Sequence, residues 1–328
     1  MGSNTGRTIN YLIRPAKSIE RKMLRDGFQR LFPFGRIEEY QYIGFGAKYF
    51  ADFTLFHTSL NISQMISIEQ DHNNKERYEF NKPFKCISLE YGKSSDVLHK
   101  LSLDKLSICW FDYDDRFSET ILSDTAHLVE NLPSGSIVAL SYNSKPYSLN
   151  ELQCEYGKEE TNPHKRKYSE LLGKKLLPTG FEERGMTKWN NHSKILCKSL
   201  NSHIESCLST KNAGLEPQDK MHFRQIFYFD YKDGVEMSTV VFLLFSEKDK
   251  KKNADCKMKE LSFYRDDDDM FKIEVPNLTY KEIKLLYENM PFEPGKDSKL
   301  LKVVTEKDIE LFSKYYRYFP SFYEVQMV

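Results

Sequence analysis

One stretch of the sequence decides the fold: residues 40–71, YQYIGFGAKYFADFTLFHTSLNISQMISIEQD. It predicts a strand over residues 40–43, a glycine turn over residues 44–46, a helix, and a second strand over residues 65–68. The helix is indicated by apolar residues that recur near the helical period between Phe50 and Leu60. Because the second strand ends on the carboxylate of Glu69, this order is typical of a Rossmann-like half-domain that holds a nucleotide-type cofactor.

The glycine turn also narrows the class of cofactor. Glycine lets the backbone approach a ligand closely, and an acid after the second strand accepts hydrogen bonds from ribose hydroxyls. The third glycine of the dinucleotide fingerprint is missing, and the bulky Tyr49 leaves a diphosphate poorly accommodated. A cofactor without a diphosphate fits better, which favours S-adenosylmethionine (SAM) over NAD.

Composition limits the partners and the compartment. The 328 residues include 48 Lys and Arg and 48 Asp and Glu, so no overall field draws the protein to nucleic acid or to a membrane. Contact with nucleic acid would need a local patch, for which residues 164–167 and 248–252 are the candidates. The six cysteines form no Cys-x-x-Cys pair, and no apolar run suits a membrane span or a signal peptide. These features predict a cytoplasmic protein.

The chain divides into four predicted parts. Residues 1–35 contain a capping helix, whose basic residues mostly form a solvated face. Arg14 and Lys17 come shortly before the expected cofactor site in the sequence, where they could contact a carboxylate. Residues 36–146 and 222–246 form a Rossmann-like α/β core, with an insertion over 147–221 as a substrate or partner lid. Residues 247–328 form a C-terminal extension, mostly helical.

The core alternates strands and helices. Further strands are predicted over residues 86–90, 106–111 and 137–142, and their apolar runs suit a parallel sheet buried on both faces. A late hairpin follows, with strands over 224–231 and 238–245 and an Asp233-Gly234 turn.

Five parallel strands followed by an antiparallel hairpin resemble the class I SAM-dependent methyltransferase fold. This resemblance implies that the turn of Gly44, Phe45 and Gly46 holds the methionine end of SAM and that Glu69 binds the ribose. It implies that Asp96 meets the adenine amino group and that Asp112, at the end of the fourth strand, lies where cofactor and substrate meet. Glu69 and Asp96 also suit a plainer role, as caps of helix starts.

A narrower resemblance rests on the 42–69 run, the 14–23 opening and the aromatic 315–318 ending. These resemble bacterial proteins labelled putative O-methyltransferases, some of which are found beside phage-defence genes. The resemblance implies a methyltransferase that acts within bacterial antiviral defence.

The motif after the fourth strand, Asp112-Tyr113-Asp114-Asp115, favours one class of acceptor. It lacks the prolines of amino-methylating DNA enzymes, and the chain has no Pro-Cys loop for methylation of cytosine at C5. We therefore expect transfer to a hydroxyl or carboxylate, with Asp112 and Asp114 as catalytic residues. Metal-dependent O-methyltransferases are similar here, which implies a Mg²⁺ site of Asp112, Asp114 and Asn143, although Ser141-Tyr142 replaces the usual second acid.

Two other functions remain open. The large insertion and the aromatic segment 315–322 would suit a non-catalytic or partner-dependent SAM-binding module in a multiprotein complex or a homo-oligomer. A nucleic-acid methyltransferase is the other alternative, provided that the two basic runs form an exposed patch.

Overall fold

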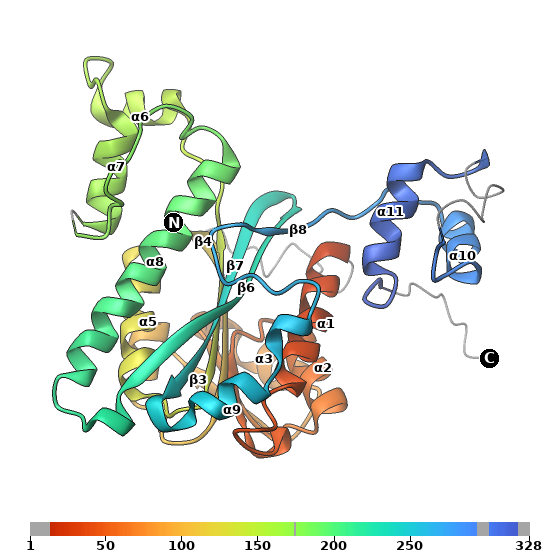
Figure 1. Ribbon diagram of the computed structural model, residues 1–328, viewed down its shortest axis with the longest axis horizontal. Helices are drawn as coiled ribbons and strands as arrows, with labels where there is room; N and C mark the ends of the chain where they lie inside the picture. Colours follow the sequence, from red (N-terminus) through yellow and green to blue (C-terminus); the bar gives the residue numbers. More distant parts are fainter. Residues whose placement is uncertain (1–13, 174, 294–301, 321–328) are drawn as a thin grey trace.

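The computed structural model describes residues 14–173, 175–293 and 302–320, which form a sheet of eight strands with helices on both faces (Figure 1). The strand order is β3-β2-β1-β4-β5-β7-β6-β8. Strands β1 to β5 are parallel, β7 runs antiparallel between β5 and β6, and β8 is parallel to β6. The predicted class I sheet with a late hairpin is therefore confirmed. The strands are β1 (Gln41–Gly44), β2 (Gln64–Glu69), β3 (Ile87–Tyr91), β4 (Ser107–Arg116), β5 (Ile137–Asn143), β6 (Met221–Asp233), β7 (Val235–Ser246) and β8 (Phe271–Ile273).

Helices form a layer on each face of the sheet, and two more helices, α10 and α11, lie near the C-terminus. One face of the sheet is covered by α1 and α2, and the other by α5 and α8. The helices are α1 (Pro15–Gln29), α2 (Ala51–Leu60), α3 (Lys75–Asn81), α4 (Ser94–Leu98), α5 (Glu119–Asn131), α6 (Leu149–Tyr156), α7 (Pro163–Leu172), α8 (Trp189–Asn212), α9 (Lys250–Asp255), α10 (Tyr280–Glu288) and α11 (Glu306–Tyr315).

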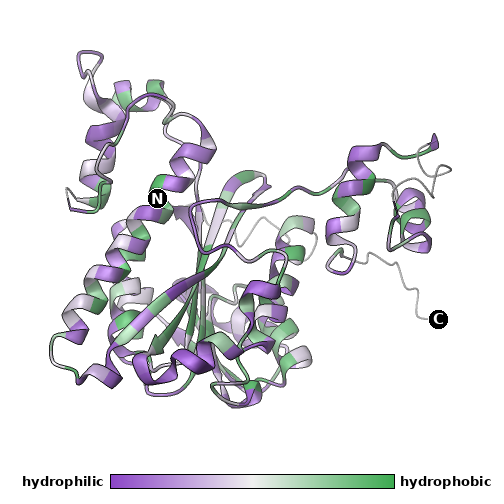
Figure 2. Cartoon of the chain, in the orientation of Figure 1, coloured by the Kyte–Doolittle hydropathy of each residue, from purple (hydrophilic) through white to green (hydrophobic). Residues whose placement is uncertain are grey.

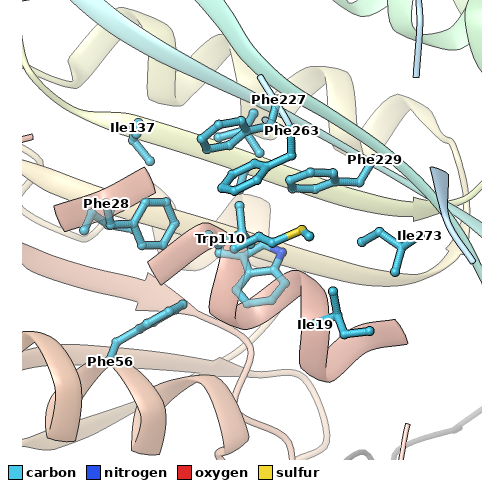
Figure 3. Close-up of a cluster of buried hydrophobic side chains, with 14 of the residues drawn as sticks. Ile19, Phe28, Phe56, Trp110, Ile137, Phe227, Phe229, Phe263 and Ile273 are labelled. Carbon is cyan, nitrogen blue, oxygen red and sulfur yellow. The ribbon is translucent and has the colours of Figure 1, made fainter. Parts of the chain in front are cut away.

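Alternation along the central strand β4 builds both cores. Ile108 and Trp110 point into the cluster under α1 and α2, whereas Cys109 and Phe111 point into the cluster under α5 and α8, as the two-residue period of a strand requires. Figure 3 shows Trp110 surrounded by side chains from α1, α2 and the late strands. Hydrophobic residues accordingly concentrate in the strands, and hydrophilic ones on the outer helices (Figure 2).

Helix α1 is more buried than its sequence indicates. The helix begins at Pro15, whose fixed φ and missing N–H suit a first helical turn. The prediction of a solvated basic face is wrong for Arg21, which is only 8% exposed. Lys17 is 3% exposed and contacts a carboxylate, as its place in the sequence allowed. The helix packs under the sheet through Ile19, Met23 and Phe28, so its polar side also meets protein rather than solvent.

The insertion divides into two parts with different roles. Helix α8 packs on the sheet through buried Leu196, Leu200 and Ile204, so it belongs to the core layer. Helices α6 and α7 project beyond it, on the opposite side of the molecule from α10 and α11 (Figure 1).

The C-terminal extension closes back on the core. Strand β8 of this extension joins the sheet beside β6. Ile309 and Phe312 of α11 join the same hydrophobic cluster as α1. Lys22 of α1 donates hydrogen bonds to the carbonyl oxygens of Tyr318 and Phe319, both at 3.0 Å. The last two residues of the predicted aromatic segment, 321 and 322, lie outside the described residues.

Candidate functional site

A cavity of about 690 Å³ lies at the carboxyl ends of β1, β2, β3 and β4. This is the edge at which open α/β sheets bind their ligands, and the volume suits a cofactor-sized molecule. Its walls come from α1, the turn after β1, the end of β2, the β3–α4 turn and the end of β4. All of its lining residues fall between Lys17 and Thr120, so the described part of the predicted lid does not line it.

The glycine turn is tied to the predicted ribose acid through one hydroxyl. The Gly46 N–H donates to Ser67 Oγ at 2.9 Å, and Ser67 Oγ donates to Glu69 Oε1 at 2.7 Å. A Cβ on residue 46 would lie 2.6 Å from Ser67 Oγ, and one on Gly44 would lie 2.8 Å from the Tyr42 hydroxyl. Both glycines are therefore required by close approach within the protein as well as by any ligand.

The turn after Gly46 has an unusual backbone. Ala47 and Phe50 both have a φ of 46°, in the left-handed region that non-glycine residues rarely adopt. Phe50 thus precedes α2 instead of forming part of it. Such conformations persist where surrounding structure holds them, and they gather at ligand sites. Gly46, Ala47 and Tyr49 all line the cavity.

Glu69 lies in the cavity wall and is only 5% exposed. Burial raises the pKa of its carboxyl to about 7, and the hydrogen bond from Ser67 and the backbone N–H groups of Ala47 and Gly46 partly oppose this shift. The alternative role as a helix cap belongs instead to Asp71, whose carboxylate accepts a hydrogen bond from the Asn73 N–H. Glu69 does not cap this helix, and its carboxylate lines the cavity, where a ligand can reach it.

Asp96 lies elsewhere than the resemblance implied. It is exposed in the first turn of α4 and is not among the residues that line the cavity, whereas Ser94 and Ser95 are. Its contact with adenine stays a prediction. A different acid, Asp124 of α5, is buried behind this wall and accepts hydrogen bonds from the hydroxyls of Ser94 and Tyr113. The sequence around Asp124 offers no signal that would have singled it out.

Asp112 lies inside β4, because this strand continues to Arg116 through a bulge instead of ending at residue 111. Its Oδ1 accepts a hydrogen bond from Lys17 Nζ at 2.9 Å. Its Oδ2 has no hydrogen bond within the described residues, and the side chain is 24% exposed in the cavity wall. One oxygen is thus fixed and the other is open to a ligand.

Lys17 is the centre of the charges at this end of the cavity. Its Nζ lies 2.8 Å from Glu20 Oε2, donates to the Tyr231 hydroxyl at 2.9 Å, and stands 4.7 Å from the centre of the Trp110 ring. Burial alone disfavours the charged ammonium, but the carboxylates of Asp112 and Glu20 outweigh it and hold the pKa of Lys17 well above its usual value. Lys17 therefore remains a cation.

The residues of the predicted Mg²⁺ site are not brought together around an ion. Asp114 lines the cavity but is exposed. Asn143 pairs with Arg116 in the sheet, and its Oδ1 accepts a hydrogen bond from the Lys145 N–H at 2.9 Å. No group of three or more acids, histidines or cysteines within the described residues could hold a metal ion. The ammonium of Lys17 already neutralises Asp112, so this donor set does not fit Mg²⁺.

Comparison with known proteins identifies the family. The family model described as "Putative O-methyltransferase" matches residues 9–327. The chain belongs to this family. A comparison with curated proteins found no match.

Several solved methyltransferase structures are similar to this member of the Putative O-methyltransferase family, at low identity. The O-methyltransferase TomG from Streptomyces achromogenes is 10% identical over 69% of this chain and 80% of its own, with a TM-score of 0.36. A putative O-methyltransferase from Klebsiella pneumoniae is 12% identical over 70% and 90%, with a TM-score of 0.33. An rRNA methylase from Streptococcus thermophilus is 8% identical over 68% and 95%, with a TM-score of 0.35. At this distance, their substrates do not transfer to this chain.

Membership in this family makes the protein a methyltransferase, and SAM is the methyl donor that its cavity fits. The buried acid Glu69 suits ribose hydroxyls, and the glycine turn leaves room beside it. The sequence indicated that Lys17 could contact a carboxylate, but not that this carboxylate is Asp112. It missed Tyr231, because the two residues meet only through tertiary packing.

The two basic runs predicted as a nucleic-acid patch are matched by nearby acids. Lys248 pairs with Asp219 at 2.7 Å, Lys250 with Glu247 at 2.6 Å and Lys252 with Asp249 at 2.9 Å. In α7, Arg166 and Lys167 pair with glutamates in the same way. These runs therefore carry little uncompensated positive charge. None of the helices within the described residues has the length and apolar character needed to cross a membrane.

Proposed function

We propose that this methyltransferase acts on an oxygen acceptor, a hydroxyl or a carboxylate, with Asp112 as the general base for a hydroxyl. The observation that carries the proposal is the difference between the two oxygens of Asp112. Oδ1 is held by Lys17, and Oδ2 has no partner within the described residues and lies in the cavity wall. A fixed carboxylate with one open oxygen can accept the proton of a hydroxyl in the cavity.

The charged neighbours of Asp112 suit this role. Lys17 stays protonated, and its ammonium holds Asp112 Oδ1 at 2.9 Å. The contacts of Lys17 with Glu20 and Tyr231 fix its position, and thereby that of Asp112. When bound, SAM would supply an electrophilic methyl group on its sulfonium. Methyl transfer is a displacement in line, so the main work of the protein is to position the acceptor and to take up its proton.

The other walls of the cavity suit the remaining parts of SAM. Glu69 would accept hydrogen bonds from the ribose hydroxyls, and the β3–α4 turn with Ser94 and Ser95 would adjoin the adenine. Arg21 lines the cavity from the same helix as Lys17, on the side of the glycine turn, and is our candidate for the methionine carboxylate.

The proposal does not include the predicted metal ion, defence role, partners or nucleic-acid substrate. Mg²⁺ is not part of it, since the donor set around Asp112 does not fit the ion. A role in antiviral defence, a protein partner, a homo-oligomer and a nucleic-acid substrate stay predictions, because no described contact bears on them. A non-catalytic SAM-binding module differs from this enzyme in one measurable property: it binds SAM without transferring its methyl group.

The test measures SAM binding and methyl transfer separately. Transfer of label from SAM is followed across pools of hydroxyl and carboxylate compounds, with and without a metal chelator, and SAM binding is followed by calorimetry. We expect metal-independent turnover of at least one hydroxyl compound. Asp112→Asn should keep SAM binding within a few-fold but lower turnover by about 100-fold or more, the usual contribution of a general base. Tight SAM binding by the wild-type protein without turnover in any pool would support the non-catalytic module instead.

A further inference from the structure

A second cavity, of about 430 Å³, lies between α8, β8 and α11. Its walls are the first turns of α8 with Asn190 and Lys194, the segment 265–274 and part of α11. Figure 1 shows β8 running between α8 and α11, away from α2 and α3. No residue is shared with the lining of the cavity at Asp112, so this is a separate site.

Positive charges from different elements converge on this second cavity. Its lining includes four cations: Lys194, Arg265, Lys272 and Lys314. None of them forms an ion pair with a carboxylate within the described residues. Lys272 Nζ donates to Asn190 Oδ1 at 3.0 Å, and Arg265 Nη1 donates to the carbonyl oxygens of Tyr264 and Ser262. Like charges gathered in one hollow repel each other unless an anion joins them.

This arrangement differs from the basic runs elsewhere on the molecule. Lys248, Lys250 and Lys252 each have a carboxylate within 3 Å, as the short ion-pair distances of 2.7, 2.6 and 2.9 Å show. Around the second cavity only Asp269 and Glu274 contribute acids to the lining, and neither pairs with one of the four cations. Within the lining, four cations face two acids. Asp268 and Asp230 lie outside the lining and interact electrostatically with Lys194 and Lys272.

The floor of the second cavity is already held in place. The Tyr315 hydroxyl donates to the Lys272 carbonyl oxygen at 2.6 Å and accepts a hydrogen bond from the Glu274 N–H at 3.3 Å. The Arg265 guanidinium lies 5.2 Å from the centre of the Phe271 ring. Phe271, Met270 and Leu311 add apolar surface beside the charges. Binding here needs little ordering of the backbone, which favours affinity.

We propose that the second cavity binds a small phosphorylated molecule. A phosphate monoester carries a charge of about −1.5 to −2 at neutral pH and three acceptor oxygens, so it can take hydrogen bonds from several of the four cations at once. A single carboxylate offers only two acceptor oxygens. The apolar floor would take the rest of the ligand, and the volume suits a ligand of nucleotide size. Asp269 and Glu274 would repel a long polyanion, so the site selects a compact phosphate over a nucleic-acid strand.

The test uses uridine monophosphate, uridine, inorganic phosphate and a short oligothymidine as probes, each titrated into the full chain by calorimetry. S-adenosylhomocysteine is kept in excess to fill the cavity at Asp112. We expect saturable one-site binding of uridine monophosphate, weaker binding of phosphate and no binding of uridine. Lys272→Ala with Lys314→Ala should weaken the monophosphate at least about tenfold, since each charge-assisted hydrogen bond contributes roughly that factor. The matched control, Lys248→Ala with Lys250→Ala, removes the same charge at paired lysines and should leave binding unchanged.

Three outcomes would overturn the proposal. The first is no saturable binding of uridine monophosphate at about 10 mM. The second is equal weakening by the cavity variant and by its control, which would show a general charge effect. The third is tight binding of oligothymidine without binding of the monophosphate, which would make this a nucleic-acid surface. Lys314 is exposed, so Lys314→Ala alone provides a folded variant if the double substitution lowers the melting temperature.

Discussion

Lys17 Nζ and Asp112 Oδ1 lie 2.9 Å apart, although 95 residues separate them in the chain. This contact joins the first described helix to the central strand of the sheet at the edge where ligands bind. Helix α1 is therefore a wall of the candidate cofactor cavity as well as a cap on the hydrophobic core.

Replacing Lys17 tests whether this contact supports activity or only stability. Lys17→Met leaves the carboxylates of Glu20 and Asp112 without their buried cation, and we expect a loss of about 3 kcal/mol in the free energy of unfolding. Lys17→Met with Glu20→Gln removes one stranded charge and should recover part of that stability. Turnover should remain low in both variants if Lys17 positions Asp112. Chemical denaturation and label transfer measure the two effects, and recovery of turnover together with stability would contradict the positioning role.

Glu69 predicts how SAM binding depends on pH. Because burial raises the pKa of its carboxyl from 4.5 to about 7, the acid is protonated below that pH and ionised above it. The ionised form accepts hydrogen bonds from both ribose hydroxyls, so SAM affinity should rise as the pH increases from 6 to 8 and then level. Glu69→Gln should weaken SAM about tenfold at pH 8. Calorimetry across this range also supplies the control, because the remaining pH dependence of Glu69→Gln reports the titration of SAM itself.

The same pKa predicts an effect on stability without ligand. A carboxyl whose pKa is raised on folding binds its proton more tightly in the folded state, so the folded state loses stability as the pH rises from about 4.5 to about 7. For a shift of this size the loss is on the order of 3 kcal/mol by pH 8. Glu69→Gln should remove this part of the pH dependence in urea unfolding. Identical pH profiles for the two proteins would show that folding does not raise the pKa of Glu69.

Gly46 tests the close packing of the turn. A Cβ there would lie 2.4 Å from the Phe50 ring and 2.6 Å from Ser67 Oγ, so Gly46→Ala should displace both side chains and cost about 1–3 kcal/mol of stability. SAM binding should weaken as well, because the acid loses its hydrogen-bond donor. Gly214→Ala is the matched control, since a Cβ at Gly214 meets no atom within 4 Å. Melting temperature and SAM affinity check both variants, and equal effects at the two glycines would refute the packing argument.

Arg21 predicts which part of SAM the first helix recognises. Arg21→Ala should weaken SAM about tenfold, since a charge-assisted hydrogen bond to the methionine carboxylate is lost. The affinity for 5′-methylthioadenosine, which lacks the amino-acid part, should not change. Arg25→Ala serves as control, because Arg25 lies one turn further along α1, pairs with Asp26 and does not line the cavity. A similar loss of affinity for SAM and for 5′-methylthioadenosine would show that Arg21 does not bind the methionine carboxylate.

The sequence was sufficient for those features that local patterns determine. Apolar periodicity placed the parallel strands, and the Asp233-Gly234 turn placed the hairpin of β6 and β7. The acid at the end of β2 was found because strand ends and ligand sites coincide in this class of fold. Each of these inferences needs only a few neighbouring residues.

Contacts between distant segments were beyond such patterns. A basic helix face normally faces solvent, so burial of Lys17 and Arg21 depends on the strands that α1 meets. The continuation of β4 past Asp112 depends on pairing between Arg116 and Asn143 across a bulge. The predicted metal site failed for the same reason, because its ligands were judged by sequence position without the lysine that lies beside them.

The hydrogen bonds from Lys22 to Tyr318 and Phe319 have a consequence for synthesis of the chain. They hold α1 at a position five residues after Lys17, the lysine that contacts Asp112. During translation, α1 emerges first but lacks this anchor until residues 318 and 319 have left the ribosome. We therefore expect the candidate cofactor cavity to gain this support late, and nascent chains that stop before residue 318 to bind SAM poorly even when the sheet has formed.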